Sequence, residues 1–380
     1  MDTKIVYFTG SLPRKGETPF GGGEVGNVRT IRMLKSFGYH VVAVRKQRSN
    51  AKSSWFTNRL QYPFRTLTNT IKWFFVLLFG SRKNSIAHVS GFYGKTIYVE
   101  TLQVFIAKLL GYRLVYELRG GGATTFYENG SKTYRKQFRY ILNKADFLLS
   151  QGKENEPLLF SICNTPVFYY PNCVQQGFYP DELPQINEKS INLLFFGRIE
   201  EVKNPLLIVK ATSLLQKEFD NITLTMLGNG KTELIEMVRK QMQNTLRTGT
   251  WQLMPGCSHD ELKGLFVNKH FYVFPSQQPR EGQSNAVTEA MGYGIIPIAS
   301  PQGFNRSTIG NDFLIVNDLT AESYAERIAT IIRNGDIETY SCFVRGRFLE
   351  NYTESAVFNR VKGVYATFFE KERRKDQKRL

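Results

Sequence analysis

The first segment that could do chemistry follows a short apolar run, Leu193–Phe196, which is typical of a buried strand. It begins with Gly197-Arg198 and continues to Lys203-Asn204-Pro205. A glycine lets the backbone turn where a strand ends, and a proline fits the first turn of a helix. Arg198, Lys203 and the helix N-terminus would bring positive charge to one place, and this arrangement suits a diphosphate.

A second segment combines two carboxylates with another helix start. Glu281 and Gly282 precede the expected helix, Ser284 and Asn285 stand where it would begin, and Glu289 lies about two turns into it. Serine is a favoured N-cap residue, and the free amides of a first helical turn can bind a phosphate. The apolar neighbours of Glu289 predict that it is buried. A buried carboxylate needs hydrogen-bond donors, and ribose hydroxyls can supply them.

Near the N-terminus, Gly21-Gly22-Gly23-Glu24-Val25-Gly26 is expected to open a helix whose amides can approach an anion. The letters match the dinucleotide-binding pattern G-x-G-x-x-G. However, the preceding strand ends near Thr9, and no acidic residue follows before Glu100. Arg45, Lys46 and Arg48 could instead meet a 2′-phosphate, which leaves an NADP-dependent oxidoreductase as an alternative.

Apolar strand-like runs alternate with helical patterns along the chain, for example in 5–9, 25–37 and 40–44, and again in 191–196, 204–216 and 222–227. This alternation predicts two Rossmann-like α/β domains with parallel sheets. We expect an N-terminal domain over 1–178, a C-terminal domain over 179–355, and a C-terminal helix over 356–380 that packs back on the N-terminal domain. Ligands of such folds bind at the carboxyl ends of the strands, here in a cleft between the domains.

Together these motifs resemble family 4 glycosyltransferases of the bacterial capsule or surface-polysaccharide type. Glu281 and Glu289, with seven residues between them, resemble the E-x7-E motif of that family. The segments 197–205 and 21–24 are similar to its phosphate-binding segment and its acceptor-side glycine loop. Pro171-Asn172-Cys173-Val174 resembles its interdomain P-N-G-V, with Cys in place of Gly.

The resemblance implies a GT-B fold, in which two Rossmann-like domains face each other across a cleft. It further implies a retaining, metal-independent transfer from a nucleotide-sugar, without a cofactor. Arg198, Lys203 and Glu281 would then be catalytic, and the donor would be bound by Glu289, Gly197, Gly282, Ser284 and Asn285. Many members carry a His after the strand that ends here at 116–120, where this chain has Glu117 and Arg119. With Gly22 and Gly23, these two are the acceptor-side candidates.

Positive charge is concentrated in one part of the chain. The net charge is +17, and between Glu24 and Glu100 there are thirteen basic residues and no acidic one. Within this stretch, residues 45–83 interleave basic residues with aromatic ones, among them Trp55, Trp73 and Phe74. Such a composition suits contact with an anionic membrane surface. The alternative is a core helix with a solvated basic face.

The chain has four cysteines without zinc spacing and an N-terminus unlike a signal peptide, and its longest apolar run is Trp73–Phe79. These features predict a cytoplasmic protein on the inner face of the cell membrane. The leading hypothesis is sugar transfer from a nucleotide-sugar to a lipid-linked glycan. The alternatives are the same fold with a soluble acceptor and a basic nucleic-acid-binding protein. No known nucleic-acid-binding pattern is present, so we expect no nucleic-acid partner.

Overall fold

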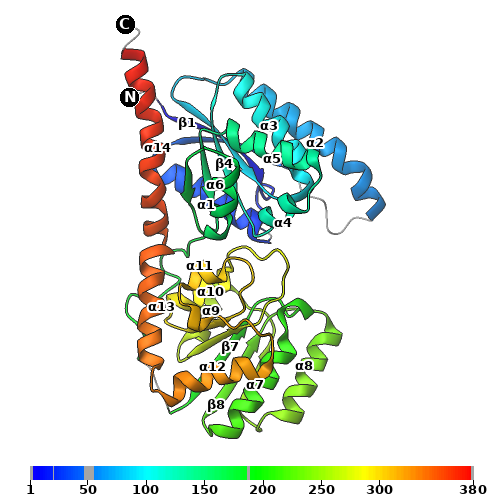
Figure 1. Cartoon of the computed structure of the whole chain (residues 1–380), viewed down its shortest axis with the longest axis vertical. Helices are drawn as coiled ribbons and strands as arrows, with labels where there is room; N and C mark the ends of the chain where they lie inside the picture. The colour runs from blue at the N-terminus through cyan, green and yellow to red at the C-terminus, as the bar shows by residue number, and fades with distance from the viewer. Residues whose placement is uncertain (1–2, 20, 47–54, 186–188, 378–380) are drawn as a thin grey trace. The chain divides into compact units, whose positions relative to one another are not determined.

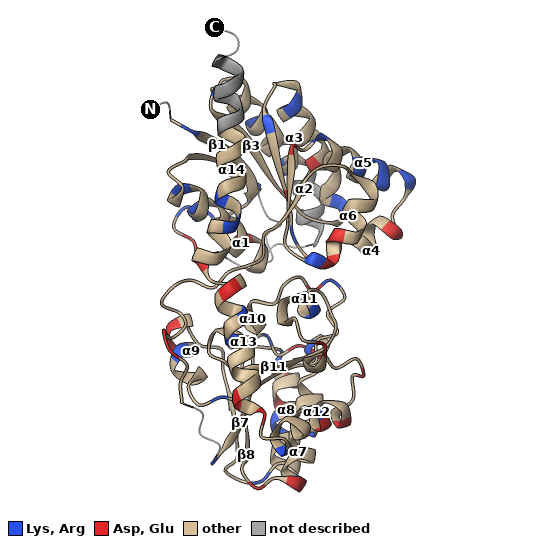
Figure 2. Ribbon diagram, turned by 60° about the vertical axis from the view of Figure 1, so that its left-hand side comes forward, with Lys and Arg blue, Asp and Glu red and all other residues tan. Residues whose placement is uncertain are grey.

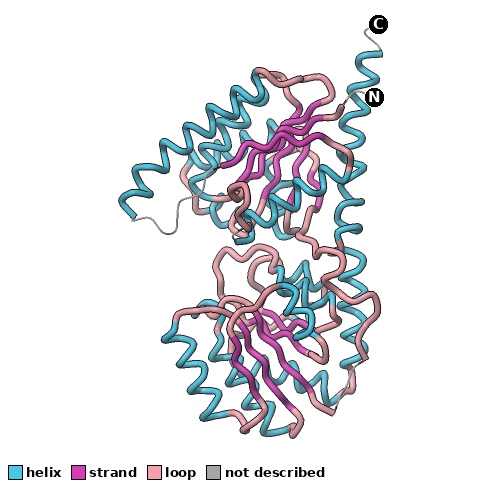
Figure 3. Tube along the Cα trace, turned by 180° about the vertical axis from the view of Figure 1, so that it is seen from behind, coloured by secondary structure: helices cyan, strands magenta, loops and turns pink. Residues whose placement is uncertain are grey.

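The computed structural model describes residues 3–19, 21–46, 55–185 and 189–377 (Figure 1). The chain forms two compact units. Unit 1 comprises Met1–Pro171 and Phe358–Leu380, and unit 2 comprises Asn172–Val357. Each unit has a parallel sheet covered by helices (Figure 3). The predicted fold class, two Rossmann-like α/β domains, is confirmed.

Unit 1 contains a six-stranded sheet in the order β2-β1-β3-β4-β5-β6, in which every neighbouring pair is parallel. The strands are β1 (Ile5–Ser11), β2 (His40–Lys46), β3 (Ser85–Gly91), β4 (Arg113–Leu118), β5 (Phe147–Ser150) and β6 (Val167–Tyr169). The helices are α1 (Gly21–Ser36), α2 (Trp55–Leu78), α3 (Ile97–Leu109), α4 (Ala123–Glu128), α5 (Lys132–Lys144) and α6 (Glu156–Ile162). The last helix of the chain, α14 (Glu354–Gln377), contributes its residues from Phe358 onward to this unit.

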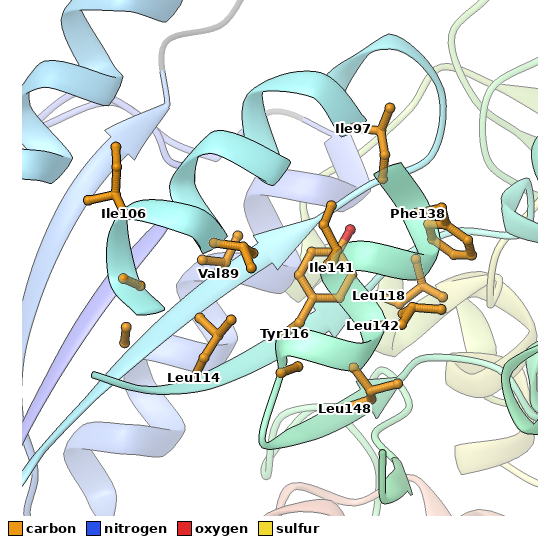
Figure 4. Close-up of a cluster of buried hydrophobic side chains, with 14 of the residues drawn as sticks. Val89, Ile97, Ile106, Leu114, Tyr116, Leu118, Phe138, Ile141, Leu142 and Leu148 are labelled. Atoms are coloured by element: carbon orange, nitrogen blue, oxygen red, sulfur yellow. The ribbon is translucent and has the colours of Figure 1, made fainter. Parts of the chain in front are cut away.

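The main core of unit 1 lies between the sheet and the helices α2, α3 and α5, which pack side by side on one face (Figures 1 and 4). Leu114 and Tyr116 of β4 and Val89 of β3 meet Ile141 of α5 there. Trp73 of α2 is fully buried in the same core, and its indole N–H donates to the backbone carbonyl of Gln103 in α3 at 3.0 Å. This contact fixes α2 against α3.

On the other face of the sheet, a buried polar cluster is centred on Glu117 of β4. Glu117 forms an ion pair with Arg119, and its Oε2 lies 2.9 Å from Nε2 of His88. The other ring nitrogen of His88 lies 2.9 Å from the hydroxyl of Tyr365 in α14. Burial alone would raise the pKa of Glu117, but Arg119 and His88 outweigh it and hold that pKa below its ordinary value. The cluster therefore ties the C-terminal helix to the sheet of unit 1.

Unit 2 contains a five-stranded sheet in the order β11-β10-β7-β8-β9, again with parallel neighbours throughout. The strands are β7 (Ile191–Phe196), β8 (Ile222–Leu227), β9 (Trp251–Met254), β10 (Phe271–Phe274) and β11 (Ile296–Ala299). The helices are α7 (Pro205–Glu218), α8 (Thr232–Thr245), α9 (His259–Phe266), α10 (Asn285–Gly292), α11 (Asn305–Ile309), α12 (Ala321–Arg333) and α13 (Ile337–Asn351).

Replacement of Tyr365 by Phe should destabilise the protein by about 1–3 kcal/mol, because it leaves a buried ring nitrogen of His88 without its partner. Urea denaturation of the two proteins would measure the difference. Tyr98→Phe is the matched control, since Tyr98 is 46% exposed. Equal loss of stability in both variants would contradict a structural role for the cluster.

Candidate functional site

The phosphate-binding candidates of unit 2 lie where β7 ends. Gly197 follows the strand directly and has a φ of +136°, a conformation that side chains rarely allow. The side chain of Arg198 is 73% exposed, and its Nη1 lies 2.7 Å from Oε1 of Glu200. An exposed guanidinium held by one surface carboxylate can turn to meet an anionic ligand at small cost.

Lys203 and Glu281 are brought together, although they are 78 positions apart in the sequence. They form an ion pair, and both side chains are largely buried. The hydroxyl of Ser276, just after β10, lies 3.2 Å from Lys203 Nζ and donates to Glu281 Oε2 at 3.0 Å. Lys203 Nζ also lies 4.8 Å from the centre of the Phe274 ring. A cation and a carboxylate are thus fixed side by side at the carboxyl end of the sheet.

The start of α10 lies next to this ion pair in the chain, separated from it by Gly282 and Gln283. Ser284 is the N-cap residue, but its side chain makes no hydrogen bond to the first turn. The amides of that turn have no partner within the helix, so they can bind an anion. Asn285 Oδ1 accepts from Asn172 Nδ2 at 2.9 Å, and Gln283 also bonds to Asn172. These bonds hold the loop before α10 in place.

Glu289 lies on α10 with a side chain that is 12% exposed, and its Oε1 is 3.4 Å from Nε2 of His259. His259 is the first residue of α9, and its ring lies 4.3 Å from that of Phe178. The hydrogen bond to Glu289 raises the pKa of His259 against the opposing effect of burial. A carboxylate with one exchangeable partner at a partly open position can accept hydrogen bonds from ligand hydroxyls.

The acceptor-side candidates lie in unit 1, in two settings. Gly22 and Gly23 are in the first turn of α1, where Gly22 is exposed and Gly23 is partly buried. Glu117 and Arg119 are almost fully buried and belong to the cluster with His88. Arg119 Nη2 also donates to the carbonyl of Gly26 at 3.1 Å, which links β4 to the first turns of α1.

Three residues of the unit 2 site were not found from the sequence. Ser276 and Asn172 contact candidate residues. A single Ser carries no distinctive pattern, and Asn172 was noted only as part of a segment that resembles an interdomain motif. His259 had an indirect signal, because Ser258 and Glu261 form the capping box that begins α9. That pattern places the start of the helix, but it does not reveal that His259 meets Glu289 of another helix. Among the described residues, no cluster of three or more His, Cys, Asp or Glu side chains could hold a metal ion.

Residues 181–343, which contain all the unit 2 candidates, match the family described as "Glycosyl transferases group 1". No protein with curated annotation gave a significant match. The fold is similar to a glycosyltransferase from Rickettsia africae, with a TM-score of 0.72 and 15% identity over 96% of this chain and 98% of that one.

Two further structures are similar to this chain over nearly its whole length. HepE from Anabaena in complex with UDP has a TM-score of 0.67 and 12% identity over 96% of this chain and 100% of its own. Sucrose-phosphate synthase from Thermosynechococcus elongatus has a TM-score of 0.69 and 14% identity over 97% and 99%. These similarities show that the chain has the GT-B fold.

The pairing of His259 with Glu289 predicts a pKa for His259 above its ordinary value of about 6.5. Glu289→Gln should lower this pKa, as measured by NMR titration of the ring protons, whereas Glu261→Gln on the same helix as His259 should not. Because the pKa is raised by folding, the stabilisation is present in full below pH 6.5 and is lost as the pH rises through the folded-state pKa. His259→Gln should therefore destabilise the protein more at pH 5.5 than at pH 8.5. Equal effects at both pH values would contradict the pairing.

Proposed function

We propose that the protein is a retaining, metal-independent glycosyltransferase of family 4 that moves a sugar from a nucleotide-sugar to a lipid-linked glycan in surface-polysaccharide synthesis. The observation that carries the proposal is the ion pair of Lys203 with Glu281 beside the start of α10, inside the segment that matches the glycosyltransferase family. The structure of HepE with UDP supports a nucleoside diphosphate as the part of the donor that this site binds.

In this proposal, each part of the site binds one part of the donor. Glu289 accepts hydrogen bonds from the ribose, and His259 yields its place on that carboxylate. The amides at the start of α10, at Ser284 and Asn285, bind the diphosphate together with Arg198. Gly197 and Gly282 allow the close approach of backbone to phosphate. Glu281, held by Lys203 and Ser276, accepts a hydrogen bond from a hydroxyl of the transferred sugar.

Charge on the departing diphosphate grows as the glycosidic bond breaks. Lys203 and Arg198 lie where that charge would develop, and fixed cations and helix amides stabilise it without reorganisation. A divalent ion would serve the same purpose in other transferases. With these groups in place, we propose that the protein needs none.

The membrane contact that we propose uses part of the predicted segment 45–83, together with helix α3. Trp73 is fully buried, so it takes no part in the membrane contact that the composition of residues 45–83 suggested. Arg48 and Lys52 lie outside the described residues, as does the side chain of Trp55. Lys46 is turned inward, where its Nζ donates to the carbonyl of Ser90 at 2.8 Å.

The exposed apolar residues instead form a stripe along each of two packed helices, which we call the α2–α3 face. Phe64 of α2 and Phe79, the residue just after α2, are 73% and 81% exposed and belong to the first stripe. The remaining members of the face are Leu67, Ile71, Phe75 and Leu78 from the α2 stripe, and Tyr98, Leu102, Phe105 and Leu109 of α3.

Basic residues border the α2–α3 face. Helix α5 packs against α3 and carries no acidic residue, as Figure 2 shows by its blue segments. Its exposed basic residues include Lys132, Arg135, Lys136 and Lys144. Apolar side chains flanked by cations match a bilayer with anionic headgroups. Among the described helices, none is long and apolar enough to cross a membrane. We therefore propose peripheral attachment to the inner face of the cell membrane, beside the lipid-linked acceptor.

The proposed donor site is tested by Glu289→Gln. Loss of a charged acceptor for the ribose should weaken UDP binding and raise the donor KM by a factor of roughly 10 to 100, since such bonds contribute about 1.5–3 kcal/mol. Calorimetry with UDP, GDP and ADP would measure binding, and transfer would be assayed with excess EDTA. Glu236→Gln, an exposed carboxylate on α8, is the control. If no nucleotide binds the wild type, the proposed nucleotide-sugar donor is wrong. If EDTA abolishes transfer, the proposed metal independence is wrong.

The proposed membrane surface is tested by cosedimentation with vesicles of 30% anionic phospholipid. Phe75→Ser/Phe79→Ser should weaken binding at least about tenfold at every salt concentration, because burial of each Phe contributes on the order of 1.5–3 kcal/mol. Arg135→Gln/Lys136→Gln should weaken it mainly at low salt, where charges are least screened. Phe343→Ser, a half-exposed residue of unit 2, is the control. Transfer to soluble acceptors by a protein that ignores these vesicles would favour the alternative of a soluble acceptor.

A further inference from the structure

Unit 1 contains a cavity of about 330 Å³ at the carboxyl ends of its strands. Ser11 is the last residue of β1, and Ser90 and Gly91 end β3. The chain places β2 on one side of β1 and then crosses over to place β3 on the other side, so β1 and β3 flank the topological switch point of the sheet. The cavity lies at this point. Open parallel sheets bind their ligands at such points. The volume is at the lower end of the range for ligand sites, which suits one small ring.

The cavity contains a polar group that the protein leaves without a partner. Gln103 of α3 lines it and is 0% exposed, yet neither its amide nitrogen nor its amide oxygen has a hydrogen-bond partner. An amide that is buried without hydrogen bonds destabilises the folded state. A ligand that both donates and accepts hydrogen bonds would satisfy Gln103.

The charged side chains that line the cavity are each paired with an opposite charge. Lys46 Nζ lies 3.6 Å from Glu100 Oε1, and Glu100 also accepts from the backbone of Phe92 and from the hydroxyl of Tyr116. Burial lowers the pKa of Lys46, while Glu100 opposes this effect. Arg119 is matched by Glu117. Lys46 and Arg119 are thus each paired with a carboxylate, and Glu100 itself lines the cavity. This arrangement favours a neutral ligand, because an anion would meet Glu100 as well as Lys46.

The walls of the cavity join it to the α2–α3 face. Thr66 and Asn69 of α2 line the cavity, while Leu67 and Ile71 of the same helix are exposed. On α3, Val99 and Gln103 line the cavity, while Tyr98 and Leu102 are exposed. The two helices thus have the cavity on one side and the exposed apolar surface on the other.

We propose that this cavity binds the terminal sugar of the acceptor as a neutral, hydroxyl-rich ring, and that Gln103 is a specificity-determining residue for it. The inference rests on the proposed glycosyltransferase function. Vicinal hydroxyls donate to the amide oxygen of Gln103 and accept from its nitrogen, while Asn69 and Lys46 bind the other side of the ring. Phe92, 36% exposed at the rim, packs on a face of the ring, and the lipid of the acceptor follows the α2–α3 face.

The test uses octyl glycosides as probes of the full-length protein, below their micelle concentrations. Octyl β-glucoside, β-galactoside and β-N-acetylglucosaminide carry neutral rings, and octyl phosphate carries an anion on the same chain. Saturation-transfer NMR should show that at least one glycoside binds with its ring protons in contact. Gln103→Leu should weaken that binding about tenfold and leave any binding of octyl phosphate unchanged. Asn69→Ala should weaken glycoside binding as well.

Gln137→Leu is the matched control, because the amide oxygen of Gln137 is also buried without a partner but lies outside the cavity. Gln103→Leu removes an unpaired amide, so its melting temperature should not fall. The proposal is overturned if no glycoside binds, if Gln103→Leu and Gln137→Leu bind alike, or if octyl phosphate displaces the glycoside from Gln103. Calorimetry with UDP separates the two proposals, since failure of this cavity leaves nucleotide binding intact, whereas failure of the transferase proposal abolishes it in the wild type.

Discussion

Every strand in both sheets runs parallel to its neighbours, and this shared direction decides where chemistry is possible. The carboxyl ends of the strands, and the N-termini of the helices that follow them, all lie at one edge of each sheet. In unit 2, that edge brings Gly197, Ser276 and the start of α10 together. In unit 1, it brings together Ser11, Lys46 and Gly91. Unpaired amides and converging side chains accumulate at such an edge, while the opposite edge is left with loops that only connect.

Two ion pairs with similar partners have different roles because of their surroundings. Glu117 and Arg119 are almost fully buried and are also hydrogen-bonded to Thr30, while Glu117 bonds to His88, which in turn bonds to Tyr365. Removing one partner there leaves a buried charge without compensation, so the cluster stabilises the fold. Lys203 and Glu281 retain some exposure and have Ser276 as a neighbour. A small ligand can therefore reach that pair more easily than it can reach the buried one.

The alternation of strands and helices was predictable because most strands are continuous apolar runs, such as Ile191–Phe196. The central strand β3, Ser85–Gly91, was missed because its residues Ser, Ala, His and Gly have no such pattern, although all seven are buried. Within 73–79, every residue is apolar, so periodicity could not show that Trp73 faces the core while Phe75 and Phe79 face solvent. The pairs Lys46–Glu100 and His259–Glu289 join residues distant in sequence, and only the fold reveals them.

The geometry of α2 and α3 explains how the cavity of unit 1 and the exposed apolar surface could take part in one binding event. In a helix, residues three or four apart share a face, and the stripe at 98, 102, 105 and 109 alternates with the cavity-lining positions 96, 99, 100 and 103. The α2 stripe alternates in the same way with Thr66, Asn69 and the buried Trp73. Because the indole of Trp73 bonds to the carbonyl of Gln103, the two helices cannot slide independently. An amphiphilic molecule would therefore meet the cavity and the exposed apolar surface at a fixed spacing, and its head and tail would be positioned together.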